Sequence, residues 1–332
     1  MDVTAEKPLG DGPDGTRGKQ PLVILTGPTA VGKTELSIEL AKRINGEIIS
    51  ADSMQVYIGM DIGSAKVTQP QMQGVPHHLI DELEPDEPFH VVKFQELAKR
   101  YIAEIYSRGK IPVLAGGTGF YIQAVLYDID FTENEGDSSY RKELERQVLE
   151  KGADYLHQQL AAVDQKAAQE IHANNIKRVI RALEFFHETG TPISRHNETE
   201  RQKKSPYQFA YFVLNDVRQQ VYARIDKRVD LMMEAGLLEE VKKLKAKGYT
   251  RDMVSMQGLG YKEILDYLGG NISLEEAVYI IKRDTRHFAK RQLTWFKREP
   301  EVTWVSKDAF GYDRERILDF MLDVMKQRGI AE

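Results

Sequence analysis

The residues that most clearly indicate a chemical role form one glycine-rich segment near the start of the chain. Residues 27–34 read GPTAVGKT and match the pattern G-x-x-x-x-G-K-[ST]. Glycine lets such a loop wrap so that successive backbone N–H groups point at a phosphate chain, and the following helix adds its positive N-terminal end. The pattern predicts a phosphate site made of Gly27, Pro28, Thr29, Ala30, Val31, Gly32, Lys33 and Thr34. In it, Lys33 contacts the terminal phosphates and the Thr34 hydroxyl is the Mg²⁺ ligand.

A carboxylate follows the next strand-like run of the chain. Asp52 comes directly after the short run Glu47 to Ala51. From there it could take a proton from the group that attacks the phosphorylated donor, or it could hold Mg²⁺ through water. It could also be a loop aspartate that accepts hydrogen bonds from neighbouring backbone N–H groups. The residues themselves leave these three roles open.

Two further motifs carry weaker signals. Gly116-Gly117-Thr118-Gly119 follows the apolar run 111–115 and suits contact with a diphosphate or an incoming nucleophile, although a tight strand–helix turn explains it as well. The adjacent His77 and His78 suggest a metal, but neighbours in sequence rarely bind one ion without further ligands. A structural role is the better interpretation of the histidine pair.

Strand-like runs alternate with helical patterns on either side of these motifs. Apolar runs at 21–26, 47–51, 111–115 and 207–214 read as buried strands, and the segment 32–44 reads as a helix. Near-continuous apolar strands of this kind favour a parallel sheet covered on both faces. We therefore predict an α/β fold with a P-loop NTPase-like core. Ligands of such sheets bind at the carboxyl ends of the strands, where the three polar strand ends are expected to meet.

The middle of the chain has a different character. Helical patterns dominate at 140–149, 153–163 and 175–188, and a polar stretch follows at 194–205. This arrangement predicts an all-helical subdomain at 128–205, inserted into a core formed by 21–127 and 206–332. The first 20 residues, rich in glycine, proline and aspartate, read as a loose leader or expression remnant. A helix capped by Ser273 is expected to run to about residue 298.

Composition narrows the classes of protein. The chain has 332 residues, 41% of them hydrophobic and 29% charged, with a net charge of −5 and no cysteine. No apolar run approaches the roughly 18 residues of a membrane span, so we expect no membrane partner. The lack of cysteine excludes disulfides and thiolate chemistry and favours a cytoplasmic protein. Basic residues nevertheless concentrate in 282–298, and the segment Arg283–Arg291 is nearly all of one sign, which suits a polyanion.

Taken together, the motifs resemble the tRNA dimethylallyltransferase family, also called tRNA isopentenyltransferases. The matching stretches are GPTAVGKT at 27–34, DSMQVY at 52–57, DIGSAK at 61–66, PHHLID at 76–81, GGTGFY at 116–121, RVIRALE at 178–184, RIDKRVD at 224–230, GLGYKE at 258–263 and TRHFAKRQLTWF at 285–296. The resemblance covers almost everything from residue 21 to about 305. Departures are small, with Ser64 where the family often has Thr and Ala173 where Pro is common.

The resemblance implies transfer of a dimethylallyl group from its diphosphate to N6 of adenosine 37 in tRNAs that read codons beginning with U. Asp52 would accept the N6 proton, Thr118 and Arg228 would bind the diphosphate, and Mg²⁺ would accompany it. The insert would grip the anticodon stem-loop through its basic side chains. The tRNA contacts implied are Asp52, Ser53, Met54, Gln55, Thr118, Arg141, Lys177, Arg178, Arg181, Gln257, Tyr261, Arg286, Lys290 and Arg291.

Other functions fit part of the pattern. A P-loop small-molecule kinase would use the same cradle for ATP, with Asp52 as base toward a hydroxyl, but the chain lacks a clear arginine-rich lid. An RNA-binding switch driven by nucleotide would bind RNA without modifying it. An adenine-nucleotide isopentenyltransferase would share the donor but use a free nucleotide as acceptor. The basic insert and the basic C-terminal helix favour tRNA, and we expect a monomer.

Overall fold

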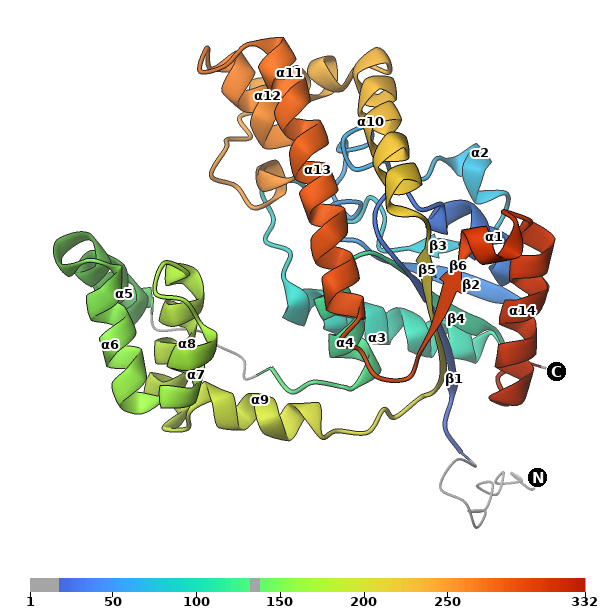
Figure 1. The fold of residues 1–332 in the computed structure, drawn as a ribbon, viewed down its shortest axis with the longest axis horizontal. Coiled ribbons are helices and arrows are strands. Elements are labelled where there is room, and N and C mark those ends of the chain that lie inside the picture. Colours follow the sequence, from blue (N-terminus) through green and yellow to red (C-terminus); the bar gives the residue numbers. More distant parts are fainter. Residues whose placement is uncertain (1–17, 132–137, 332) are drawn as a thin grey trace, which may run out of the picture. The chain divides into compact units, whose positions relative to one another are not determined.

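The computed structural model describes residues 18–131 and 138–331. The chain divides into two compact units, and each is described by itself. The first unit ends at Leu126 and resumes at Pro206, and the second is the inserted segment Tyr127–Ser205. Figure 1 shows the sheet of the first unit and the purely helical composition of the second.

The first unit is built on six parallel strands in the order β3-β2-β4-β1-β5-β6. The strands are β1 (Pro21–Thr26), β2 (Gly46–Ala51), β3 (His77–His78), β4 (Ile111–Gly116), β5 (Gln208–Asn215) and β6 (Val302–Ser306). Four of them were predicted from apolar runs, whereas the short β3 and the partly exposed β6 were missed. The predicted α/β class with a parallel sheet is confirmed.

Helices cover both faces of the sheet (Figure 1). One face packs against α1 (Lys33–Arg43) and α14 (Arg314–Gln327), and the other against α3 (Val91–Ser107) and α4 (Gly119–Leu126). Alternate strand residues such as Val23 and Leu25 join the core cluster that α1 and α14 close with Leu36, Leu40 and Met321. Because both faces are covered, the central strands are apolar throughout, as in β1, where Leu22–Leu25 have no exposed surface.

The rest of the first unit is helical and stands at the carboxyl side of the strands. Its elements are α2 (Gln69–Met72), α10 (Arg218–Glu234), α11 (Leu237–Ala246), η1 (Ser255–Gln257), α12 (Tyr261–Leu268), α13 (Leu274–Phe296) and η2 (Lys307–Phe310). As predicted, Ser273 caps α13, and its hydroxyl accepts a hydrogen bond from the N–H of Glu276. The helix ends two residues earlier than expected.

The second unit contains helices around its own small core. They are α5 (Ser138–Lys151), α6 (Ala153–Val163), α7 (Gln165–Glu170), α8 (Ile176–Thr189) and α9 (Ile193–Arg201). Leu156, Leu160, Val179 and Leu183 pack together at its centre. The polar stretch at 194–205, for which the sequence predicted no particular element, mostly forms α9. The carboxylate of Asp164 holds the first turn of α9, because it accepts hydrogen bonds from the N–H and hydroxyl of Ser194.

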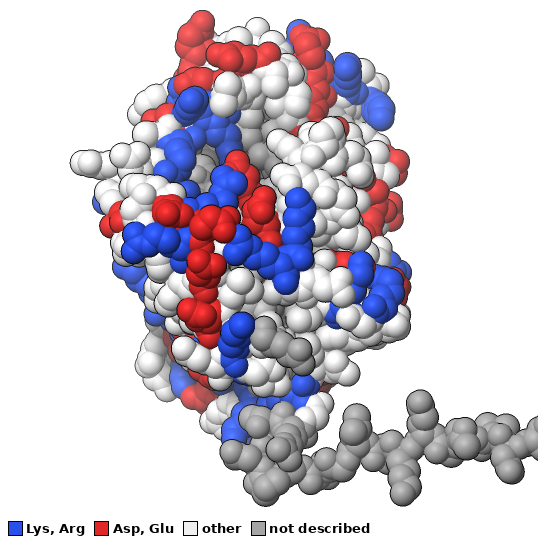
Figure 2. Space-filling model, turned by 90° about the vertical axis from the view of Figure 1, so that its right-hand side faces the viewer, with Lys and Arg blue, Asp and Glu red and all other residues white. Residues whose placement is uncertain are grey.

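Two surface properties bear on function. Over the described ranges, no helix combines the length and apolarity needed to cross a bilayer. Figure 2 shows the face that carries α1 and α14, where acidic and basic side chains are interspersed. Ion pairs join the two helices there, including Arg43 with Glu315 and Arg314 with Glu35. This face therefore has mixed charge and does not offer the field of one sign that a polyanion prefers.

Candidate active site

Three strand ends meet at one edge of the sheet, as predicted. Thr26 of β1 and Ala51 of β2 both pair in register with Gly116 of β4, which lies between them. The Thr26 hydroxyl donates a 2.7 Å hydrogen bond to the carbonyl oxygen of Gly116. A Cβ on Gly116 would lie 2.2 Å from the carbonyl oxygen of Ala51, so the close approach of the strands requires glycine. The motifs that follow these strands are consequently brought together.

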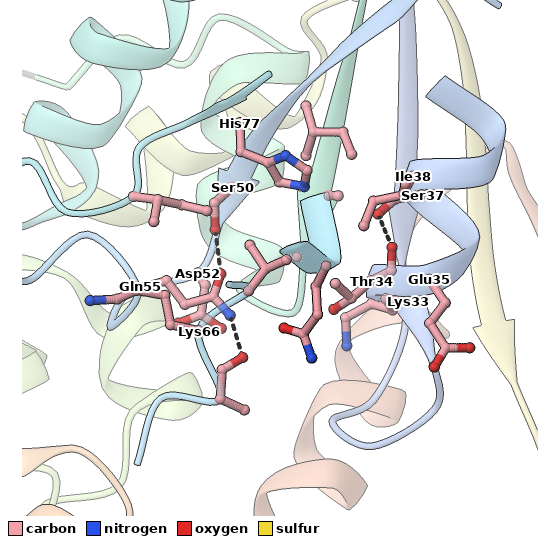
Figure 3. A pocket seen from close by; sticks show the side chains of 18 of the residues that line it. Lys33, Thr34, Glu35, Ser37, Ile38, Ser50, Asp52, Gln55, Lys66 and His77 are labelled. Atoms are coloured by element: carbon pink, nitrogen blue, oxygen red, sulfur yellow. Dashed lines mark hydrogen bonds between the residues drawn. The ribbon is translucent and has the colours of Figure 1, made fainter. Parts of the chain in front are cut away.

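A cavity of about 610 Å³ opens at this edge. Figure 3 shows Lys33 and Thr34 of α1 on one side of it, and Asp52, Gln55 and Lys66 on the other. Arg228 of α10 also lines it. The walls thus combine cations that suit a diphosphate with a carboxylate that suits a proton transfer.

The phosphate loop occupies the strand–helix junction that its pattern predicted. Gly27 has a φ of 143°, and a Cβ there would lie 2.2 Å from the carbonyl oxygen of Leu214 in the neighbouring strand. The Lys33 ammonium turns back onto the loop and donates to the carbonyl oxygens of Gly27 at 3.0 Å and Pro28 at 2.9 Å. Burial, reinforced by the nearby Arg228, lowers the pKa of Lys33 to about 7. An anion in the cavity would stabilise its charged form.

Side chains outside the cavity hold the loop in place. Arg224 donates a 2.8 Å hydrogen bond to the carbonyl oxygen of Ala30, and its guanidinium pairs at 2.6 Å with the fully buried carboxylate of Asp216. Lys307 donates at 3.3 Å to the carbonyl oxygen of Val31. These groups satisfy the outward carbonyls of the loop, so that its N–H groups can serve a ligand.

Asp52 sits on the wall opposite the phosphate loop. Its carboxylate accepts a 2.8 Å hydrogen bond from the N–H of Met54. Burial raises the pKa of Asp52, while this hydrogen bond and the nearby Lys33 act in the opposite direction. The backbone-capping role and the proton-accepting role considered for Asp52 are thus compatible, because the first holds the carboxylate at the cavity wall.

The two other predicted catalytic residues differ in position. Arg228 reaches the phosphate loop, with its guanidinium 3.4 Å from the hydroxyl of Thr29, and burial lowers its pKa. Thr118 is half-buried in the turn after β4, where its N–H donates to the carbonyl oxygen of Ala51. Among the described residues that line the cavity, Thr118 does not occur, although its neighbour Gly116 does. Its contact with the donor remains a prediction.

The segments expected to touch RNA near the target pack against one another. A Cβ on Gly258 would lie 2.5 Å from Met54, so the loop after β2 lies directly on the segment before α12. Ser53 to Gln55 are half-buried and Gln257 is exposed with its amide bonded to the carbonyl oxygen of Arg251. Tyr261, in contrast, has no exposed surface, and its hydroxyl donates at 2.8 Å to Glu240. The expected RNA contact of the Tyr261 side chain is therefore wrong.

Glu240 of α11 organises a loop that the sequence reasoning did not connect with it. Its carboxylate accepts hydrogen bonds of 2.8 to 3.2 Å from the N–H groups of Asp61, Ile62 and Gly63. The same loop continues to Ser64–Lys66, which line the cavity. Three consecutive N–H groups on one carboxylate make a rigid turn, and Glu240 thereby shapes a cavity wall that it does not itself line.

Lys66 was likewise overlooked. Its side chain is 4% exposed, and its ammonium contacts the carbonyl oxygen of Tyr57 and the carboxylates of Asp61 and Asp81. The motif DIGSAK contains part of the signal, because it holds both Lys66 and its partner Asp61. Nothing in the pattern says that Lys66 is buried or that Asp81 also contacts it. We assign Lys66 to the support of the cavity wall.

The paired histidines have protein partners. His77 bonds through Nδ1 to the carbonyl oxygen of Val75 at 2.8 Å, and His78 bonds through Nε2 to Glu47 at 2.8 Å. Within the part of the chain that the structure describes, no three His, Asp or Glu side chains converge as a metal site would require. These partners agree with the structural role inferred for the pair.

The basic side chains of α13 are less available to a polyanion than the sequence of this helix indicated. Arg286 pairs at 2.5 Å with Asp226 of α10, and Arg283 pairs at 2.7 Å with Asp284. Lys282 pairs in the same way with Asp230. Across the described ranges, Lys290 and Arg291 form no salt bridge and are exposed, with Arg291 above the ring of Phe288. Of the three predicted contacts on this helix, Lys290 and Arg291 keep a charge available for RNA.

Within the second unit, the predicted RNA contacts also separate into two groups. Lys177 and Arg178 are exposed near the start of α8, and Arg181 is half-exposed one turn later. Arg141 of α5 instead pairs with the buried carboxylate of Glu184 at 3.1 Å. Arg141 thus joins α5 to α8, and its charge is partly neutralised by Glu184.

Comparison with known proteins gives a consistent result. Residues 55–299 match the model of a family described as IPP transferase. A curated tRNA dimethylallyltransferase of Lachnoclostridium phytofermentans is 63% identical over 313 residues, which is 94% of this chain and 100% of that protein.

Solved structures agree in fold. A tRNA isopentenylpyrophosphate transferase of Bacillus halodurans superposes with a TM-score of 0.71 at 48% identity, covering 94% of this chain and 98% of that one. A eukaryotic dimethylallyltransferase acting on tRNA has a TM-score of 0.75 at 28% identity, covering 86% of this chain and 74% of that one.

Proposed function

The chain belongs to the IPP transferase family and is a prenyltransferase that modifies tRNA, and from this premise we propose its donor, its acceptor atom and the roles of its residues. The proposed reaction transfers the dimethylallyl group of dimethylallyl diphosphate to the exocyclic N6 of adenosine 37, in tRNAs that read codons beginning with U. The observation that carries this proposal is that Lys33 lies across one cavity from the carboxylate of Asp52 (Figure 3). Arg228 lines the same cavity.

The reaction breaks one bond and forms one bond at the same carbon. The C1–O bond of the allylic diphosphate breaks, the N6–C1 bond forms, and diphosphate leaves with the bonding electron pair. The proton lost from N6 passes to Asp52 and then to solvent. Because the N6 lone pair is delocalised into the adenine ring, a carboxylate that accepts a hydrogen bond from N6 strengthens it as a nucleophile.

The cations of the cavity would bind the leaving group. Lys33 would release the carbonyl oxygens of Gly27 and Pro28 and turn toward the diphosphate, while Arg228 would contact it from α10. Charge that develops on the diphosphate is thus met by groups already fixed in a partly buried site, where they act more strongly than in water.

We also propose Mg²⁺ as the cofactor. The residues present fit it, because the Thr34 hydroxyl lines the cavity beside Lys33, and Mg²⁺ usually keeps several waters and binds substrate phosphates together with few protein oxygens. When bound, Mg²⁺ would neutralise part of the diphosphate charge. The protein side chains proposed to bind the donor besides it are Lys33, Arg228 and Thr118.

For the tRNA we propose two groups of contacts. Lys177, Arg178 and Arg181 of the second unit would bind the phosphates of the anticodon stem-loop, and Lys290 and Arg291 of α13 would add charge in the first unit. Phosphate contacts of this kind position the RNA, whereas the loop Asp52–Gln55 would meet the base drawn out of its stack. We further propose that the protein is cytoplasmic and acts as a monomer.

A single assay tests the proposal. The protein is incubated with Mg²⁺, dimethylallyl diphosphate and unmodified tRNA, and the digested nucleosides are identified by mass. We expect N6-dimethylallyladenosine at position 37 and one diphosphate released per modified base. Parallel reactions with ATP and a small alcohol, and with free AMP as acceptor, separate the kinase and the nucleotide prenyltransferase. Product in either of those reactions, with none on tRNA, would refute the proposal.

A further inference from the structure

We propose that Gln292 is a positioning residue that sets the separation between the phosphate loop and the turn Gly116–Gly119. Its side-chain Oε1 accepts a 2.9 Å hydrogen bond from the N–H of Thr29, and its Nε2 donates a 2.9 Å hydrogen bond to the carbonyl oxygen of Gly117. The side chain is buried, with the residue 6% exposed. The inference rests on the proposed function, because it assigns the two loops to donor and acceptor chemistry.

The surroundings of Gln292 leave it little freedom. One turn earlier on α13, Ala289 packs in a cluster with Ala30 of the phosphate loop and Ile225 of α10. On the other side, a Cβ on Gly117 would lie 2.2 Å from Nε2 of Gln292. The amide therefore fills the gap between the loops, and moving it aside would break both of its hydrogen bonds.

The chemistry of the amide matches this place. An uncharged side chain with one donor and one acceptor can bridge an N–H and a carbonyl oxygen at once, which neither a carboxylate nor an alkyl chain can do. The bridge also occupies the N–H of Thr29, so that this group is directed away from the donor diphosphate. Gln292 thereby decides which N–H groups of the loop remain available to a phosphate.

The Gln292 bridge should affect catalysis because it fixes the distance between the two loops. The turn that Gln292 holds carries Thr118, and the loop that it holds carries Lys33 and, through Thr29, the contact with Arg228. Errors of about 1 Å in the placement of reacting groups can cost about 100-fold in rate. Loss of the bridge should consequently lower kcat, even though Gln292 does not touch a reacting atom.

The first experiment compares Gln292→Glu and Gln292→Met with Gln95→Met in the full chain. Gln95 is a matched control, because it is also buried and its Nε2 donates at 2.8 Å to the carbonyl oxygen of Ala124, away from the cavity. We expect both Gln292 variants to lower kcat about tenfold or more with tRNA KM changed less than about threefold. Gln95→Met should lose thermal stability but keep kcat within about twofold.

The second experiment uses Gly117, because its contact with the Gln292 amide can be changed by a substitution at either residue. Gly117→Ala alone should lower kcat about tenfold, because the new methyl displaces the amide. In a Gln292→Ala background the obstructing amide is absent, so Gly117→Ala should lower kcat by less than about twofold. A merely destabilising role for Gln292 would not produce this dependence of one substitution on the other.

The outcomes are distinguishable. A wild-type protein that does not prenylate tRNA would refute the proposed function. A wild-type protein that does, with Gln292 variants whose kcat follows that of Gln95→Met, would overturn the positioning role alone. Equal costs of Gly117→Ala in both backgrounds would overturn it as well.

Discussion

The Nζ of Lys33 lies 2.9 Å from the carbonyl oxygen of Pro28, within the same phosphate loop. The ammonium is thus satisfied by the loop itself when the cavity holds no anion, which offsets part of the cost of burying it. Binding of a diphosphate has to exchange these carbonyl contacts for phosphate contacts. We therefore expect donor binding to turn the Lys33 ammonium away from the loop carbonyls and toward the diphosphate.

Lys33→Ala should weaken donor binding by about 10- to 150-fold, the effect of losing a hydrogen bond to a charged group worth about 1.5–3 kcal/mol. The affinity for tRNA should change little, since Lys33 faces the donor side. Titration with dimethylallyl diphosphate and, separately, with tRNA measures both. An equal loss of both affinities would show that the loop supports the fold more than it binds the donor.

Asp52→Ala should lower kcat by about 100- to 10,000-fold, the usual contribution of a general base. Donor binding should remain measurable, because the cations that bind the diphosphate are untouched. Asp52→Asn is the isosteric control. Its side chain can still accept the hydrogen bond from the N–H of Met54, but it cannot act as a base. Near-normal turnover in Asp52→Asn would remove Asp52 from the chemistry.

Thr34→Val should require much more Mg²⁺ for half-maximal activity, because the isosteric side chain lacks the ligand oxygen. Thr34→Ser retains the oxygen and should behave nearly as the wild type. Removal of divalent ions with a chelator should abolish turnover in all three proteins, and added Mg²⁺ should restore it. If the wild type works equally well in excess chelator, Mg²⁺ is not the cofactor.

Glu240→Gln should destabilise the wall formed by Ser64–Lys66. The neutral amide accepts the three N–H groups less strongly than the carboxylate, and we expect a loss of about 1–3 kcal/mol in the free energy of unfolding. Donor KM should rise several-fold with a smaller change in kcat. Glu239→Gln, on the same helix but exposed, is the matched control and should resemble the wild type.

Acid stability should depend on Glu47, which lies on β2 at the end remote from the cavity. Burial alone would raise the pKa of Glu47, but hydrogen bonds from Arg108, His78 and Lys110 outweigh it and lower the pKa to about 2. A lowered folded-state pKa stabilises the fold above the ordinary value near 4.5, and this stability is lost as the pH falls from there to about 2.

Unfolding by urea at several pH values measures this effect. Glu47→Gln should be less stable than the wild type at pH 7 by about 1–3 kcal/mol, and the two midpoints should converge toward pH 2. Glu239→Gln is the control, because Glu239 also pairs with a basic side chain, Lys242, but is exposed on α11. A gap between wild type and Glu47→Gln that stays constant with pH would contradict the assignment.

Much of the architecture could be predicted because it is encoded locally. The phosphate loop, the strand before it and the helix after it lie within about 25 consecutive residues, and apolar runs identify the other central strands. β3 consists of two histidines, and β6 is only partly buried, so neither has the apolar run that identified the others. Their places in the sheet depend on pairing with β2 and β5.

The site was harder to predict where its residues meet across long separations. Glu240 reaches a loop 177 residues earlier in the chain, and Gln292 reaches Thr29 across 263 residues. The charge of α13 was overestimated for the same reason, since Asp226 and Asp230 neutralise it from another helix. Tyr261 could not be recognised as buried, because an aromatic residue beside glycines is as typical of a binding loop as of a core.

The division of labour between the two units has an evolutionary consequence. Every described residue that lines the cavity lies outside Tyr127–Ser205, so the small-molecule half of the reaction is encoded by the flanking segments of the chain. With the insert binding the anticodon stem-loop as proposed, substitutions there would alter which RNAs are chosen and leave the leaving-group site intact. Exchange of that segment between homologues would accordingly change RNA preference and not donor chemistry.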